Sequence, residues 1–289
     1  MIAAPPPKRE RPLDRGLIAG KTRKDENFPV ASWLLPDDVR PHVTLFYAFA
    51  RAADDIADSP MLSREAKLAG LAGIEATLAG KVPSGPAEEA AARLAADLAT
   101  TGVTPLYARQ LLQAFTRDAR NDPTRTWSDL LAYCRFSAAP VGRFLIDSHG
   151  ESADAYRASD ALCAALQILN HLQDIKDDYG LRSRIYVPLK WLDEEGCALD
   201  ELGASRASPA LRRVIARVLD GVDNLIEPAR DLPRLVARKG FRAEAAIIVA
   251  IAERLKRKLR RRDPLRRRVA LTHLDHARCA ARGLARAFL

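Results

Sequence analysis

Apolar residues recur at helical spacing along nearly the whole chain, and no segment shows the apolar–polar alternation expected of a strand. Breaker residues divide this pattern at 81–86, 121–123, Gly150 and Gly240. The pattern predicts an all-α fold, with a loose polar tail over residues 1–22 and a single domain of packed helices over 23–289. The predicted helices span residues 37–58, 62–80, 87–101, 104–120, 127–149, 153–179, 208–235, 240–262 and 265–287.

Two of the predicted helices carry a polar stripe between apolar neighbours. Side chains three or four residues apart lie on one face of a helix. A single stripe is typical of an ordinary amphipathic helix, but both stripes here end in aspartates spaced i,i+4, which favours a shared cavity between the two helices. The first stripe consists of Tyr47, Arg51, Asp54 or Asp55, and Asp58, and the second of Gln167, Asn170, Asp174 and Asp178.

The two aspartate clusters, residues 54–58 and 174–178, are each predicted to lie where a helix ends. The last turn of a helix carries unpaired carbonyls, and a carboxylate there costs roughly 0.3–1 kcal/mol. Repulsion between like charges at i,i+4 adds to that cost. We therefore expect a neutralising cation. Mg²⁺ is the natural candidate, because it binds one or two carboxylates together with phosphate oxygens and water.

The implied ligand is a diphosphate held between the two clusters. Arg51 and the run Arg182-Ser183-Arg184 would supply further positive charge to it. Loss of a metal-bound diphosphate leaves a carbocation, which needs an apolar wall with few nucleophiles and some aromatic stabilisation. Residues 133–142 suit such a wall, because they combine Tyr133 with a run of small side chains. A di-iron bundle is disfavoured, since it requires Glu-x-x-His pairs and His171 is not part of one.

Composition and charge indicate the cellular compartment and the binding partners of the protein. Hydrophobic residues make up 48% and charged residues 29% of the chain, as in a globular protein, and its start has no apolar signal core. With four dispersed cysteines, these features predict a cytoplasmic protein with reduced thiols. The net charge of +9 is concentrated between Arg254 and Arg268. This segment is interpreted as a solvated helix face or as a peripheral contact with anionic lipid on the inner membrane face, whereas nucleic acid is disfavoured because no reader motif is present.

Several runs of residues resemble the motifs of the squalene/phytoene synthase family. Residues 47–58 are similar to its first aspartate motif and residues 167–178 to its second. The run 182–188, Arg-Ser-Arg-Ile-Tyr-Val-Pro, resembles the arginine–tyrosine segment that follows, and Tyr133-Cys134 with the small residues up to Gly142 resembles the tyrosine–cysteine motif. The resemblance spans about residues 24–190. It implies an isoprenoid synthase fold around a central cavity, Mg²⁺ as cofactor and a prenyl diphosphate substrate.

Carried onto this chain, the resemblance assigns roles to individual residues. Tyr133 becomes the group that lies beside the cation or handles a proton, and Asp55 and Asp177 become alternates for the metal ligands. The expected catalytic residues are Tyr133, Asp54, Asp58, Asp174 and Asp178, of which the four aspartates bind Mg²⁺, and the expected diphosphate contacts are Tyr47, Arg51, Gln167, Asn170, Arg184 and Tyr186.

Three departures from the usual family pattern point to one branch. Residues 24–29 read Lys-Asp-Glu-Asn-Phe-Pro, Gln173 stands where many members have Arg, and residues 137–142 read Ser-Ala-Ala-Pro-Val-Gly instead of Val-Ala-Gly-x-Val-Gly. Together they resemble the hydroxysqualene synthase branch of bacterial hopanoid biosynthesis, which implies ionisation of presqualene diphosphate and quenching with water. The alternatives are a condensing squalene, presqualene diphosphate or phytoene synthase that uses farnesyl or geranylgeranyl diphosphate, and a non-catalytic helical assembly partner. Enzymes of the same pathway would be further partners.

Overall fold

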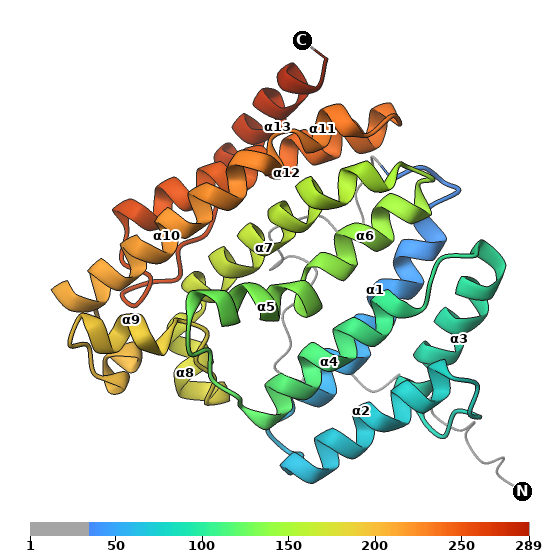
Figure 1. The fold of residues 1–289 in the computed structure, drawn as a ribbon, viewed down its shortest axis with the longest axis horizontal. Helices are drawn as coiled ribbons and strands as arrows, with labels where there is room; N and C mark the ends of the chain where they lie inside the picture. Colours follow the sequence, from blue (N-terminus) through green and yellow to red (C-terminus); the bar gives the residue numbers. More distant parts are fainter. Residues whose placement is uncertain (1–34, 289) are drawn as a thin grey trace, which may run out of the picture.

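The computed structural model describes residues 35–288, and within that range every regular element is helical (Figure 1). The predicted all-α class is therefore confirmed. The predicted tail over residues 1–22 and the run 24–29 lie outside the described residues. The elements are α1 (Arg40–Asp58), α2 (Arg64–Leu78), α3 (Pro86–Thr101), α4 (Leu106–Arg120), α5 (Trp127–Ser137), α6 (Ala139–Ser148), η1 (Ala153–Ala155), α7 (Tyr156–Gln173), α8 (Ile175–Arg182), α9 (Leu189–Glu194), η2 (Leu199–Gly203), α10 (Pro209–Ala229), α11 (Leu232–Leu235), α12 (Lys239–Arg261) and α13 (His273–Phe288), of which η1 and η2 are 3₁₀ helices.

Local side chains fix where several helices begin and end. Ser63, Thr126 and Ser208 precede α2, α5 and α10, and each hydroxyl oxygen accepts a hydrogen bond from the backbone N–H three residues later. At the end of α1, Pro60 disfavours helical backbone in Ser59, the residue before it. Asp58 is therefore the last residue of α1, as the sequence predicts.

Two long helices predicted before residue 180 are each broken. The predicted helix 127–149 divides at Ala138, because Pro140 lacks a backbone N–H and its ring excludes the carbonyl four residues earlier. The predicted helix 153–179 divides at Asp174, whose backbone (φ −105°, ψ 10°) is not helical. A continuous helix was the wrong prediction in both places, and the second break lies inside an aspartate cluster.

The last third of the chain also differs from the prediction. The predicted helix 208–235 divides into α10 and the short helix α11, with Arg230 and Asp231 between them. The helices α9 and η2 occupy a stretch for which the sequence predicts no helix, and the final helix begins at His273 instead of residue 265. Residues 262–272 form a connection that runs beside the second aspartate cluster. The side-chain amide of Gln173 donates a hydrogen bond to the carbonyl of Val269, and the guanidinium of Arg268 reaches Asp174.

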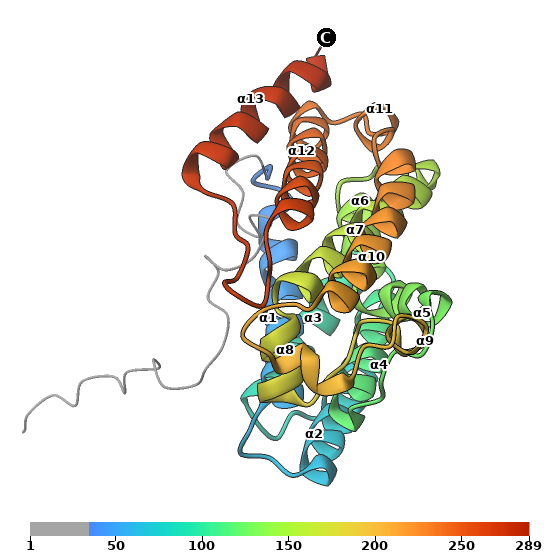
Figure 2. The same cartoon turned by 90° about the vertical axis from the view of Figure 1, so that its left-hand side faces the viewer.

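Two apolar cores lie along the molecule. One is built by α1, α2, α3 and α4, and the other surrounds α7, which packs against α5, α6, α10 and α12. The helix α6 contributes to both, since Phe144 belongs to the first core and Ile146 to the second. Figure 1 shows α2 and α3 on one side of the molecule and α12 and α13 on the other, and in Figure 2 α2 and α13 lie at opposite ends. The polar stripes of α1 and α7 meet between these two ends.

None of the helices within residues 35–288 is long and apolar enough to cross a membrane. The four cysteines lie in this part of the chain and are free thiols. Burial raises the pKa of Cys134 to about 12, so this thiol remains protonated at neutral pH and unreactive.

The close packing of α13 on α12 depends on Gly283. A Cβ atom at this position would lie 2.6 Å from the backbone of Ile247 on α12. We expect Gly283→Ala to force the two helices apart and to lower the free energy of unfolding by about 1–3 kcal/mol. Thermal unfolding measures this effect. Gly180→Ala is the matched control, because a Cβ at Gly180 meets no atom within 4 Å, and equal unfolding midpoints for the two variants would contradict the packing argument.

Candidate active site

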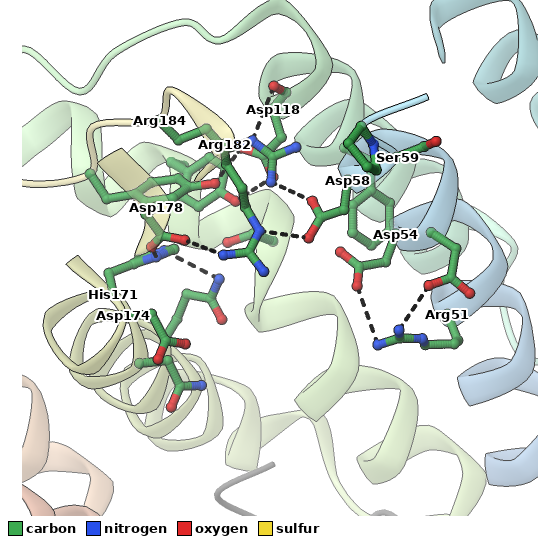
Figure 3. Close-up of a pocket in the computed structure, with 18 residues that line it drawn as sticks. Arg51, Asp54, Asp58, Ser59, Asp118, His171, Asp174, Asp178, Arg182 and Arg184 are labelled. Carbon is green, nitrogen blue, oxygen red and sulfur yellow. Dashed lines mark hydrogen bonds and ion pairs between the residues drawn. The ribbon is translucent and has the colours of Figure 1, made fainter. Parts of the chain in front are cut away.

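The end of α1 and the break between α7 and α8 face each other across a cavity of about 140 Å³. Figure 3 shows the carboxylates of Asp54 and Asp58 on one side and that of Asp178 on the other, with Arg182 between them. Within the described part of the chain, the cavity is lined by Arg51, Asp54, Asp55, Asp58, Ser59, Pro60, Phe115, Asp118, Tyr133, Ser137, Gln167, Asn170, His171, Asp174, Asp178, Arg182, Arg184 and Tyr186.

Arg51 neutralises part of the charge on the α1 side. Its guanidinium lies 2.8 Å from the carboxylate of Asp55 and 3.6 Å from that of Asp54. The stripe from Arg51 to Asp58 therefore faces the cavity, as predicted. Tyr47, one turn earlier on α1, is not among the described residues that line the cavity. A diphosphate contact from Tyr47 stays a prediction.

Two arginines at the end of α8 cross the cavity to Asp58. Arg182 Nε donates to Asp58 at 3.0 Å and Arg182 Nη1 to Asp178 at 3.3 Å, so this side chain joins the two clusters. Arg184 donates to the other oxygen of Asp58 at 2.5 Å and to the carbonyl of Ala57 at 3.0 Å. The left-handed backbone of Ser183 (φ 54°) ends α8 between these two arginines and allows both to turn toward α1.

The second aspartate cluster lies at a break between two helices and not, as predicted, at the end of one. Asp178 belongs to the first turn of α8, where the helix dipole favours a carboxylate. Asp174 stands between α7 and α8, is buried, and accepts a hydrogen bond from Arg268 at 2.6 Å. The expected repulsion at a helix end therefore applies to the first cluster and not to the second.

The charges of the first cluster are unevenly compensated. Burial would raise the pKa of Asp58, but the positive charges of Arg184 and Arg182 outweigh it and hold that pKa below its usual value. For Asp54, burial and then the negative charge of Asp58 raise the pKa. Because 36% of the Asp54 side chain is exposed, solvent screens part of this effect. The nearby arginines therefore stabilise the ionised form of Asp58 better than that of Asp54.

A buried aspartate that the sequence analysis did not single out organises one wall of the cavity. Asp118 on α4 accepts hydrogen bonds from the hydroxyls of Tyr133 and Tyr186, both at 2.8 Å. Burial raises the pKa of both phenols, and the charge of Asp118 raises it further, so both remain protonated donors. The ring of His171 stacks on Tyr186 with centroids 3.6 Å apart. His171, which the sequence analysis also passed over, bonds Gln167 through its side chain at 3.3 Å.

The described cavity is more polar than a prenyl chain requires. Apart from the rings of Tyr133 and Tyr186, its apolar lining among the described residues consists of Phe115 and Pro60. Its volume of about 140 Å³ is also smaller than the roughly 300–1,000 Å³ of a typical small-molecule pocket. The cavity is therefore the polar end of the site, and the long apolar pocket expected along residues 133–142 is not part of it.

The carboxylates of the cavity suit Mg²⁺ together with a diphosphate. Among residues 35–288, six aspartates and three arginines line the cavity, so its acidic side chains outnumber its basic ones. No group of three acidic, histidine or cysteine side chains in that range is arranged to hold a metal ion by itself. Mg²⁺ commonly takes one or two carboxylates and completes its shell with phosphate oxygens and water. The residues present fit that mode of binding.

The sequence as a whole matches one protein family. The family model described as squalene/phytoene synthase covers residues 21–275. The chain belongs to the squalene/phytoene synthase family. It is 42% identical to the hydroxysqualene synthase of Rhodopseudomonas palustris, over 90% of this chain and 88% of that protein. Its identity with the hydroxysqualene synthase of Zymomonas mobilis is 39%, over 88% of this chain and 85% of the relative.

Solved structures of squalene/phytoene synthases share the fold. The squalene synthase HpnC of Alicyclobacillus acidocaldarius superposes with a TM-score of 0.70 at 36% identity, covering 83% of this chain and 90% of that one. A dehydrosqualene synthase in complex with a ligand superposes with a TM-score of 0.73 at 24% identity, covering 90% of each chain. The isoprenoid synthase fold implied by the sequence motifs is therefore confirmed.

One departure of this squalene/phytoene synthase from the family pattern has a structural explanation. Gln173 is buried and points to the connection 262–272, where its amide binds the carbonyl of Val269. The connection in turn brings Arg268 to Asp174, the next residue after Gln173. The positive charge beside the second cluster thus comes from a residue far along the chain, which the sequence analysis treated as part of the basic segment.

The two clusters are expected to respond in opposite ways to loss of charge. Asp174→Asn removes the ion pair of a buried carboxylate with Arg268 and should lower the free energy of unfolding by about 1–3 kcal/mol. Asp54→Asn should leave stability unchanged or raise it. A carboxyl whose pKa is higher in the folded than in the unfolded state destabilises the fold at every pH above the unfolded value, and the substitution removes that effect.

Thermal unfolding at neutral pH in the presence of a chelator tests this contrast. Removing divalent cations leaves the protein's own charges to decide the result. A large loss of stability in Asp54→Asn together with none in Asp174→Asn would show that the charge balance described for the two clusters is wrong.

Proposed function

We propose that this chain is a hydroxysqualene synthase. It ionises presqualene diphosphate, rearranges the cyclopropylcarbinyl cation and quenches it with water, releasing hydroxysqualene and diphosphate in hopanoid biosynthesis. It is thus a carbon–oxygen lyase acting on phosphates. The observation that carries the proposal is the cavity in which two aspartate clusters and three arginines meet. The identities of 42% and 39% with two hydroxysqualene synthases support this branch of the family.

Carboxylates from both sides of the cavity would hold Mg²⁺. When bound, the ion neutralises charge on the diphosphate and makes it a better leaving group. Asp55 lines the cavity whereas Asp177 is exposed outside it, so Asp55 is the nearer alternate ligand. The proposed ligands are Asp54, Asp58, Asp174 and Asp178.

The arginines of the cavity would bind and orient the diphosphate. Arg182 is the most suitable, because its guanidinium already lies between the clusters and its partner Asp58 keeps a second arginine. A guanidinium can bind two phosphate oxygens at once, which fixes the orientation of the leaving group. Transfer of Arg182 from Asp58 to the substrate would also free that carboxylate for the cation. The remaining proposed contacts are Arg51, Gln167, Asn170 and Arg184.

Tyr133 and Tyr186 would form the wall on the cation side. Both hydroxyls donate hydrogen bonds to Asp118, so the aromatic rings are the parts of these side chains that remain to contact a substrate. An aromatic face attracts a cation through its quadrupole. This arrangement supports the cation-side role expected for Tyr133 over a proton-handling one, and it gives Tyr186 a role in the wall instead of a diphosphate contact.

The condensing alternatives differ in what the site must hold. A squalene, presqualene diphosphate or phytoene synthase must bind two prenyl diphosphates together, whereas a hydroxysqualene synthase binds one substrate and one water. A non-catalytic assembly partner would have no use for the uncompensated negative charge of the cavity.

We expect the purified protein with Mg²⁺ to convert presqualene diphosphate into a C30 alcohol without NADPH. In ¹⁸O-labelled water the label should appear in the alcohol, because water ends the reaction. Mass spectrometry of the products measures both outcomes. Asp58→Asn should abolish turnover. Efficient product formation from farnesyl diphosphate alone, or a strict requirement for NADPH, would move the chain to a condensing or reducing branch.

We also propose that the protein contacts an anionic membrane surface peripherally. Only some of the basic residues in the segment 254–268 would take part in this contact. Part of the positive charge of this segment is neutralised inside the protein, so it does not form a continuous solvated face. Five of its ten basic side chains pair with acidic residues of the described structure, namely Arg254, Lys256, Lys258, Arg260 and Arg268.

Three of the five remaining basic residues of the segment lie in a shallow concavity where the connection after α12 meets the start of α10, together with two arginines from residues 206–212. Its one acidic residue, Asp263, is bonded to the backbone N–H groups of Ala207 and Leu265. None of the arginines in the concavity forms an ion pair with a residue in the range 35–288. Arg212 donates to the carbonyls of Arg260 and Arg262, and the other guanidinium groups are available to phosphate groups of a lipid surface. The arginines of the concavity are Arg206, Arg212, Arg261, Arg262 and Arg266.

Vesicle sedimentation tests this contact. At roughly 1 kcal/mol per basic residue near an anionic surface, replacing Arg261, Arg262 and Arg266 with Gln should weaken binding to anionic vesicles on the order of 100-fold. The matched control replaces Arg109, Arg135 and Arg157, three exposed arginines outside the concavity. Equal losses in both triple variants, or equal binding to neutral and anionic vesicles, would contradict the proposal.

A further inference from the structure

The helix α5 ends in a hydroxyl that lies in the cavity wall without a partner. Ser137 lines the cavity one turn after Tyr133, and its Oγ is buried. No residue in the described part of the chain accepts from it or donates to it. A serine in a helix can donate its hydroxyl to the carbonyl four residues earlier, here that of Tyr133. The absence of that bond leaves both the donor and the acceptor of Ser137 directed elsewhere.

A buried hydroxyl without a partner costs free energy, and native proteins satisfy such groups with ordered water or a ligand. The neighbouring polar groups are already engaged. The hydroxyls of Tyr133 and Tyr186 donate to Asp118, and the side chain of Gln167 bonds His171. Ser137 therefore retains hydrogen-bonding capacity within reach of the aromatic wall where the proposed cation would lie.

We propose that Ser137 holds the water molecule that ends the reaction and so determines that the product is an alcohol. This inference rests on the proposed function. Ser137 Oγ accepts a hydrogen bond from the water, which turns a lone pair of the water oxygen toward the cation. That lone pair forms the new C–O bond, and the displaced proton passes to the released diphosphate, which balances the charge. Without the water, the cation would lose a proton from a neighbouring carbon and give a hydrocarbon.

The position of Ser137 agrees with this role. It lies on the face of α5 that carries Tyr133, so the water would sit beside the aromatic wall. The same cavity contains the aspartates and arginines proposed to bind the diphosphate, which places the proton acceptor in the same enclosure.

The test is the ratio of C30 alcohol to C30 hydrocarbon formed from presqualene diphosphate in ¹⁸O-labelled water. Ser137→Ala should lower this ratio at least tenfold, while consumption of substrate continues. Ser137→Thr, which keeps the hydroxyl, should retain the ratio of the original protein. Ser148→Ala is the matched control, because Ser148 Oγ is likewise buried without a described partner but lies outside the cavity, and it should leave the ratio unchanged.

Two outcomes would overturn the proposal. An unchanged ratio in Ser137→Ala would show that the water is held elsewhere, and an equal fall in Ser148→Ala would show a general effect of losing a buried hydroxyl. If Ser137→Ala does not fold, Ser137→Gly replaces it, and the same ratio of alcohol to hydrocarbon is measured. If the original protein forms no C30 alcohol, the proposed function fails first, so the two failures are distinguishable.

Discussion

The ion pairs that Asp58 forms with Arg182 and Arg184, at the end of α8, are the contact on which the site depends. α1 belongs to one apolar core and α8 follows the central helix of the other, so these pairs join the two halves of the molecule at the cavity. Arg184 is 9% exposed and also donates to the carbonyls of Ala57 and Asp118. Such a buried, multiply bonded pair fixes geometry better than an exposed ion pair, because removing either partner would leave an uncompensated buried charge.

The same contact sets the electrostatics that a substrate would meet. The arginines compensate the charge of Asp58 better than that of Asp54, as the opposite directions of their pKa shifts indicate. The cavity thus retains negative charge for a divalent cation while presenting guanidinium groups to a diphosphate. Binding of both would exchange protein–protein ion pairs for protein–ligand ones of the same kind. Such an exchange avoids desolvating an isolated charge, and the polar end of the site is therefore organised before substrate arrives.

Sequence patterns predicted the parts of this site that follow helical spacing. The stripes from Arg51 to Asp58 and from Gln167 to Asp178 both line the cavity, because side chains at i,i+3 and i,i+4 must share a helix face. Long-range contacts could not be predicted in this way. Arg268 reaches Asp174 through a connection for which the sequence predicted a helix, and the break at Asp174 has no proline or glycine to signal it. The sequence contains one indication of the role of Asp118, because this carboxylate follows Phe115 by three residues on the apolar face of α4. Its partners, Tyr133 and Tyr186, come from other elements and could not be predicted from α4 alone.

Anomalous diffraction from a complex with Mn²⁺ and a thio analogue of presqualene diphosphate that cannot ionise would test the account most directly. Metal peaks are expected between Asp54 and Asp58 on α1 and Asp174 and Asp178 on the other side of the cavity. Arg182 should be bonded to the diphosphate and no longer to Asp58. Metal peaks elsewhere, or a bound diphosphate with the Arg182–Asp58 pair intact, would contradict it.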